Sequence, residues 1–139
     1  MIFTGAVDEL FNWKFGALPY RSLRFEWVHE RTSSFQNAPL VAYPQKKGFT
    51  RITEYNKLPI QAGKGSSYAV EYPVKYEKGS MSEPYYPILT NESLILHQRY
   101  LTEAQKVKNL ILAGRLADFR YYNMDQALQR ALDVVEAIC

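Results

Sequence analysis

Between residues 20 and 28 the chain alternates apolar and polar side chains. Leu23, Phe25 and Trp27 fall on one set of alternate positions, and the positions between them are charged. Successive side chains of a strand point to opposite faces of a sheet, so this pattern predicts a half-buried β-strand.

Three more segments of strand character follow, at residues 40–43, 49–55 and 68–72. They are separated by residues 44–48 and 61–67, which are rich in the residue types that form turns. Because the links between the strands are short, the sequence favours an antiparallel sheet.

Shorter segments lie on either side of this region. Residues 2–5 have the character of a strand that runs straight into a turn, and residues 8–15 could form a short helix. Prolines flank a tyrosine pair in residues 84–87. Proline restricts its own backbone and that of the preceding residue, so we expect an extended, rigid segment here.

After residue 90 the pattern becomes helical. Asn91 is a candidate cap for the helix, and an apolar stripe follows it at helical spacing. The stripe consists of Leu94, His97, Leu101 and Ala104. Residues 109–113 then return to strand character.

The last helix has the clearest pattern in the chain. Asn123 can cap it, and Gln126 can reach back to the cap from three positions later. A continuous apolar face follows, which predicts packing into a core. This face consists of Met124, Ala127, Leu128, Ala131, Leu132, Val135 and Ile138.

Together these elements predict an α+β fold. A chain of 139 residues can bury one core of its own. We expect a mostly antiparallel sheet region over residues 1–90. A helix, a strand and a C-terminal amphipathic helix follow over residues 91–139.

The composition points away from membrane and nucleic-acid proteins. The chain is 47% hydrophobic, but its apolar runs are too short to span a bilayer. The net charge of +3 is mild, and the basic pair Lys46-Lys47 fits a solvated loop better than a nucleic-acid patch. No leader with a cleavage site begins the chain, so nothing in it predicts secretion.

Few side chains suit a metal or a nucleophile. The single cysteine, Cys139, excludes an intramolecular disulfide and is interpreted as an inert thiol. His29 and His97 have no partner at ligand spacing, so we predict structural or surface roles and no metal site. The 11 tyrosines fit a sugar or nucleotide cleft, and they fit strand packing equally well.

The best candidate for chemistry lies at residues 114–125, where an apolar run ends at Gly114-Arg115 and a helix follows. A helix start offers unpaired N–H groups and arginine adds a fork of donors, which together favour an anionic ligand. No glycine-rich G-x-G-x-x-G loop occurs in the chain. Half of a nucleotide site is therefore expected to be missing.

Four side chains are candidate ligand contacts: Arg51, Tyr86, Arg115 and Tyr121. Arg51 lies in the middle of an expected strand and could instead pair with a neighbouring glutamate. The two tyrosines could simply pack with their hydroxyls at the surface. Arg115 is harder to explain structurally, because it stands where a strand ends and a helix follows.

These segments resemble the C-terminal part of the UDP-galactopyranose mutase family. Residues 4–23 are similar to the family pattern T-G-x-x-D…F-G…Y-R-S-L. Residues 49–54, 83–87 and 114–125 follow in the family's order, with Tyr86 and Tyr121 spaced as the family spaces them. Each motif alone is weak, but four in order are specific.

The resemblance implies a partial flavoenzyme fold and an isomerase activity. The family interconverts UDP-galactopyranose and UDP-galactofuranose with FAD, in the synthesis of cell-surface polysaccharide. The cofactor carries the covalent chemistry, while the protein positions and neutralises the diphosphate. The resemblance further implies a cytoplasmic parent protein, for which a homo-oligomer is one option. From the composition we expect no nucleic-acid partner and no membrane insertion.

The resemblance also implies roles for individual residues. Arg51 matches the arginine that grips the substrate diphosphate near the flavin. Tyr86 and Tyr121 match the two tyrosines that bind this diphosphate through their hydroxyls, and Arg115 matches an arginine that contacts FAD. The helix start that lies against the cofactor matches Met124, Asp125, Gln126, Ala127, Leu128 and Gln129.

Four positions depart from the family pattern. The family usually has Asp at Asn123, Gly at Ala117 and His at Tyr55, and a substrate-contacting Asn falls near Ala42. These differences are consistent with an altered substrate or with a divergent branch of the family.

The match does not include the family's glycine-rich unit or the helical region that covers the uridine. We therefore expect a C-terminal portion of a mutase that is inactive alone, since nothing in it seats the flavin pyrophosphate. One alternative is a non-catalytic module that holds a nucleotide-sugar or another anion on Arg51 and Arg115. Another is an interaction domain that dimerises through surfaces buried in the complete enzyme.

Overall fold

The computed structural model describes residues 1–138, which form two compact units. The first unit combines Met1–Ser22 with the chain from Tyr76 onward, and the second is Leu23–Lys75. The second unit is therefore an insertion between two parts of the first. Each unit is described separately below.

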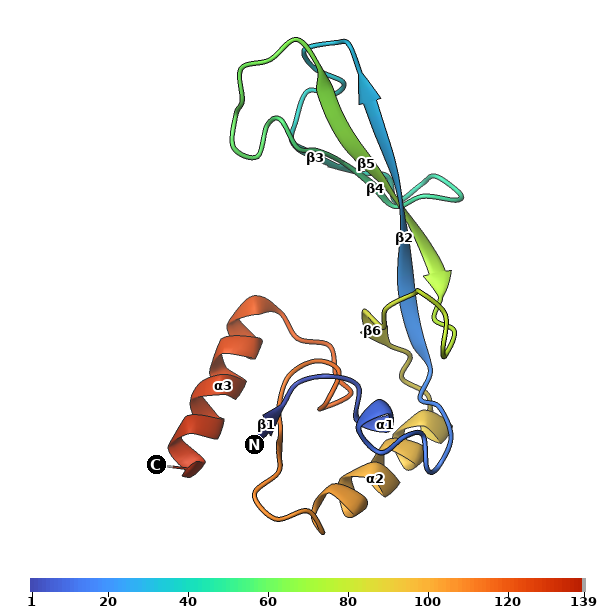
Figure 1. The fold of residues 1–139 in the computed structure, drawn as a ribbon, viewed down its shortest axis with the longest axis vertical. Helices are drawn as coiled ribbons and strands as arrows, with labels where there is room; N and C mark the ends of the chain where they lie inside the picture. The colour runs from blue at the N-terminus through green and yellow to red at the C-terminus, as the bar shows by residue number, and fades with distance from the viewer. Residues whose placement is uncertain (139) are drawn as a thin grey trace. The chain divides into compact units, whose positions relative to one another are not determined.

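Ten elements follow one another along the chain (Figure 1). They are β1 (Ile2–Phe3), α1 (Val7–Leu10), β2 (Tyr20–Glu30), β3 (Leu40–Ala42), β4 (Arg51–Glu54), β5 (Ser66–Lys75), β6 (Tyr86–Pro87), α2 (Asn91–Ala104), β7 (Ile111–Leu112) and α3 (Met124–Ile138). The larger sheet has the order β3-β4-β5-β2-β6, and the smaller one pairs β1 with β7. The predicted α+β class, with a mostly antiparallel sheet and a C-terminal helix, is confirmed.

In the second unit, each predicted strand forms close to its expected position. β4 pairs antiparallel with β3 through Ala42↔Arg51. It also pairs antiparallel with β5, from Arg51↔Glu71 to Glu54↔Tyr68. Residues 43–50 and 55–65 connect these strands, and they include the turn-rich segments noted in the sequence.

Glu54 is the buried polar centre of the second unit. Its side chain is fully buried and accepts hydrogen bonds from Ser66 Oγ at 2.5 Å and from the backbone N of Phe35 at 2.7 Å. The Lys57 ammonium lies 3.1 Å from its other oxygen. Burial alone raises a carboxyl pKa, but these hydrogen bonds outweigh it and lower the pKa of Glu54 to about 2.

The expected half-burial of β2 is correct only at its beginning. Tyr20 is 1% exposed, whereas Phe25 is 36% and Trp27 66% exposed. The second unit is built from strands alone, and no helix among its described residues covers the face that carries these two aromatic rings.

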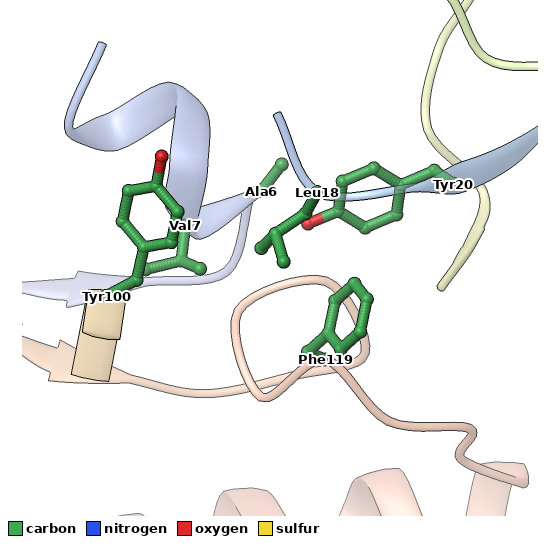
Figure 2. Packing of buried hydrophobic residues seen from close by; sticks show 6 residues of the cluster. All are labelled: Ala6, Val7, Leu18, Tyr20, Tyr100 and Phe119. Carbon is green, nitrogen blue, oxygen red and sulfur yellow. The ribbon is translucent and has the colours of Figure 1, made fainter. Parts of the chain in front are cut away.

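The first unit has a compact aromatic core. Figure 2 shows its six buried residues, which come from the chain around α1, the start of β2, α2 and the turn after β7. They are Ala6, Val7, Leu18, Tyr20, Tyr100 and Phe119. The rings of Tyr20 and Phe119 meet edge to face, with centroids 5.5 Å apart.

Two predicted helices differ in detail from the structure. The helix expected over residues 8–15 ends at Leu10, because Asn12 and Trp13 adopt left-handed backbone with φ of 48° and 52°. In α2 the cap is Thr90 and not Asn91, since Thr90 and Ser93 form a reciprocal capping box. The buried face of α2 consists of Ser93, His97, Tyr100 and Ala104, and Leu94 is 48% exposed.

The predicted core packing of α3 is wrong for most of its apolar face. Val134 is the buried residue of this helix, while Met124 is 92%, Leu128 62% and Leu132 54% exposed. The strands β1 and β7 pair in parallel. A two-stranded sheet offers too little area to bury a whole helix face, which explains the exposure of α3.

We expect the pH dependence of stability to report on Glu54. Its pKa in the folded chain lies below its ordinary value of 4.5, so its stabilising effect is complete above pH 4.5 and is lost as the pH falls toward about 2. Glu54→Gln leaves Lys57 without its buried partner and should cost ~3 kcal/mol at neutral pH.

Urea unfolding at several pH values measures this effect. Glu26→Gln, on an exposed carboxylate of the same unit, is the matched control and should change stability by less than about 0.5 kcal/mol. Equal acid sensitivity of the Glu54→Gln and unaltered chains between pH 4.5 and 2 would contradict the assignment.

Candidate functional site

The turn after β7 is held by glycine and by two backbone hydrogen bonds. Gly114 has φ of +97°, a conformation that L side chains rarely adopt. The backbone N of Asp118 donates to the Gly114 carbonyl at 2.8 Å, and that of Arg120 donates to the Arg115 carbonyl at 3.0 Å. The apolar run therefore reverses sharply here and presents Arg115 at a fixed point.

Arg115, Tyr86 and Tyr121 lie together in the first unit and are called the Arg115 cluster below. The guanidinium carbon of Arg115 is 4.7 Å from the centroid of the Tyr86 ring. The rings of Tyr86 and Tyr121 stack with centroids 6.0 Å apart and an angle of 18° between planes. The structure thus brings together three of the four candidate ligand contacts.

The Arg115 cluster is positively charged and its polar groups are available. Within residues 1–138, no carboxylate lies within salt-bridge distance of Arg115, and no hydrogen bond engages the hydroxyls of Tyr86 and Tyr121. Tyr121 is 51% exposed, while Arg115 and Tyr86 are half-buried. One guanidinium and two free hydroxyls match the donors that a phosphate or diphosphate requires.

Asp118 holds the turn against α3. Its carboxylate accepts from the backbone N of Gly114 at 3.0 Å, from the Tyr122 hydroxyl at 2.8 Å and from Arg130 Nε at 3.0 Å. Arg130 also donates to the Leu112 carbonyl at 2.8 Å. The hydrogen bond to Asp118 raises the pKa of Arg130. Burial, together with this carboxylate, raises the pKa of the Tyr122 hydroxyl.

Neither Asp118 nor Arg130 was singled out from the sequence. One signal was present, because a single acid stands between the apolar residues Ala117 and Phe119 of a turn. Such an acid needs a partner, but its partner lies 12 positions later and only the fold brings them together.

Arg51 lies on β4 in the second unit. Its Nε is 3.0 Å from Glu71 Oε1, across the strand pair, and its side chain is 40% exposed. Thr50 donates to the same glutamate oxygen at 3.1 Å. The simpler interpretation of Arg51, an ion pair with a neighbouring glutamate, is therefore observed.

The expected cofactor contacts at the start of α3 are mostly exposed. Gln126 Oε1 accepts from the backbone N of Asn123 at 2.9 Å, which is the predicted back-reaching bond. Gln129 Nε2 donates a hydrogen bond to Asp133 Oδ1 at 2.8 Å, and Asp125 is exposed. Ala127 lines a hollow of about 290 Å³ between α3, β1 and the turn after β7. The side chains of Met124 and Leu128 are largely exposed in the described chain.

The histidines have structural surroundings. His97 is buried and its Nε2–H donates to the Ala117 carbonyl at 3.0 Å, while burial lowers its pKa and keeps it neutral. His29 Nδ1 lies 2.9 Å from Ser67 Oγ. Residues 1–138 contain no group of three metal-ligating side chains. Cys139 lies outside the described residues.

Comparison with known proteins identifies the family. The sequence model of UDP-galactopyranose mutases matches residues 1–121. The chain belongs to the UDP-galactopyranose mutase family.

Three relatives show how much of such a protein the chain represents. A UDP-galactopyranose mutase of Mycoplasma genitalium is 37% identical over 92% of this chain, and one of Mycoplasma pneumoniae is 35% identical over 99%. A dTDP-fucopyranose mutase of Escherichia coli is 29% identical over 98%. The chain spans 33–36% of the length of these relatives.

Ala117, one of the departures from the family pattern, is part of the turn after β7. Ala117 is fully buried in the turn that carries Arg115, and its carbonyl receives the His97 hydrogen bond. The methyl group is therefore packed inside the turn that carries Arg115.

No helix of the described residues is long and apolar enough to cross a membrane.

We predict that Asp118→Asn loosens the turn and α3. The substitution removes the charge that Arg130 pairs with and weakens the hydrogen bonds that the carboxylate accepts, which should lower the free energy of unfolding by ~3 kcal/mol. Thermal unfolding followed by circular dichroism measures the loss.

Asp125→Asn is the matched control, because Asp125 is an exposed acid on the same helix. It should change stability by less than about 0.5 kcal/mol. An Asp118→Asn chain as stable as the control would show that the carboxylate does not hold this part of the unit together.

Proposed function

We propose that the chain forms the diphosphate-binding part of an FAD-dependent mutase that interconverts UDP-galactopyranose and UDP-galactofuranose. The observation that carries this proposal is the Arg115 cluster, in which an arginine without a carboxylate partner in residues 1–138 stands beside two free tyrosine hydroxyls. In the proposed role, Tyr86 and Tyr121 donate hydrogen bonds to the substrate diphosphate. Arg115 supplies positive charge on the cofactor side.

The residues present fit part of an FAD site. Arg115 and the exposed start of α3, from Met124 to Gln129, would hold the cofactor, whose bound isoalloxazine ring supplies the covalent chemistry. Met124 is 92% exposed on a helix start, which leaves this surface free for a large planar group. Gly114 and Asp118 keep Arg115 in place, so that its guanidinium is preorganised for an anion.

Arg51 is proposed as a further diphosphate contact. Only its Nε is engaged by Glu71, so the terminal nitrogens of its guanidinium still have donors to offer. Glu71 would then orient Arg51 and limit its rotamers. An arginine fixed in this way loses less side-chain entropy when it binds a phosphate.

We further propose that activity needs more polypeptide than the residues described. The relatives are about three times as long as the part matched. In the whole protein, residues 91–139 are proposed to complete an FAD-binding domain. Residues 1–90 are proposed to form the sheet region on the substrate side. The proposed setting is a cytoplasmic isomerase. The exposed apolar face of α3 supports the need for more polypeptide, because an apolar helix face normally packs against further protein.

UDP binding should depend on Tyr86 and Tyr121. In isothermal titration calorimetry we expect Tyr86→Phe and Tyr121→Phe each to weaken UDP binding by about threefold to tenfold, since each variant loses one hydrogen bond to the charged diphosphate. Tyr43→Phe is the matched control, because Tyr43 is a partly exposed tyrosine outside the Arg115 cluster. Equal losses in the Tyr43 and Tyr121 variants would refute the proposed role.

The chain by itself should not turn over substrate. Purified chain supplied with reduced FAD and UDP-galactofuranose is expected to form no UDP-galactopyranose, because no glycine-rich loop seats the flavin pyrophosphate. Chromatography of the sugar nucleotides measures the product, and a full-length mutase serves as the positive control. Turnover by the chain alone would show that the residues described suffice for catalysis.

A further inference from the structure

One face of β2 in the second unit carries a row of rings. Phe25, Trp27 and His29 occupy alternate positions and therefore share this face. The Trp27 ring stacks on that of Tyr55 with centroids 5.3 Å apart, and the Phe25 ring lies 6.4 Å from it at an angle of 35°. Phe25, Trp27 and Tyr55 are called the Trp27 shelf, and Trp27 remains 66% exposed within it.

A basic hollow begins where the shelf ends. Its volume is about 530 Å³, and it is lined by His29, Arg31, Lys64 and Gly65. The imidazole is fixed in place, because Ser67 Oγ lies 2.9 Å from its Nδ1 and the backbone of Gly65 lies against its ring. A Cβ on Gly65 would come within 2.9 Å of His29 Cε1, so a larger residue here would displace the imidazole.

The acidic groups of β2 are directed to the opposite face. Glu26 accepts a hydrogen bond from the Tyr72 hydroxyl at 2.9 Å, and Glu30 accepts one from the Tyr68 hydroxyl at 3.0 Å. Across residues 1–138, no carboxylate forms a salt bridge with Arg31 or Lys64. Aromatic surface and uncompensated positive charge therefore meet on one face of this unit.

We propose that this face is a second ligand site, which binds a nucleoside 5′-phosphate. The base stacks on Trp27, since stacking on an exposed aromatic side chain contributes to binding for any base. The phosphate enters the hollow and pairs with Arg31 and Lys64, with His29 Nε2 at its edge. The site belongs to the second unit, whereas the Arg115 cluster belongs to the first.

Calorimetry on the chain carrying Arg115→Ala, Tyr86→Phe and Tyr121→Phe tests the site, because this background removes the polar groups of the Arg115 cluster, on which the proposed function depends. Uridine 5′-monophosphate should bind about tenfold more tightly than either uridine or inorganic phosphate, since it engages both halves of the site. Trp27→Leu should reduce its affinity to that of phosphate. The double variant Arg31→Ala/Lys64→Ala should reduce it to that of uridine.

Lys46→Ala/Lys47→Ala is the matched control, as it removes two exposed positive charges from another turn of the same unit. Its affinity for the nucleotide should stay within about twofold of the background. Equal affinity for nucleotide and phosphate, equal losses in the two double variants, or no binding at millimolar nucleotide would each overturn the proposal. The side chains altered within the second unit are exposed, so circular dichroism should show that these variants fold as the background chain does.

Discussion

The carboxylate of Asp118 is the interaction on which the first unit's candidate site depends. It receives hydrogen bonds from the Gly114 backbone, the Tyr122 hydroxyl and Arg130, and so joins the start of the turn, its end and the last helix. Arg115 lies inside the loop that these bonds close. Its guanidinium is consequently placed by backbone geometry and not by a salt bridge of its own, which leaves its charge for a ligand.

The arginines of the chain fall into two groups by this criterion. Arg130 and Arg51 each have a carboxylate at 3.0 Å, and their charge is largely compensated within the fold. Arg115 and Arg31 have no such partner in residues 1–138, and each lies beside aromatic side chains or a basic neighbour. Within the described residues the charges of Arg115 and Arg31 are therefore available to an anion.

Local patterns predicted the elements well, because alternation in β2 and helical spacing in α3 are properties of the backbone itself. They did not predict burial, since Trp27 and Leu132 follow apolar patterns yet are exposed. What covers a face depends on distant parts of a protein. The proximity of Arg115 to Tyr86 could be predicted only from the order of the motifs and the family resemblance. The Asp118–Arg130 pair could not be predicted without the fold.

The cap of α2 was also predicted wrongly. Thr90, and not Asn91, caps this helix because Ser93 completes its capping box.

The insertion of Leu23–Lys75 between two parts of the first unit has a consequence for synthesis on the ribosome. The pairings of β3, β4 and β5 connect residues close in sequence, so this unit can form as soon as its strands emerge. The aromatic core of the other unit joins Val7 and Tyr20 to Tyr100 and Phe119. The segment around α1 must therefore wait, unburied, until Tyr100 and Phe119 have been made.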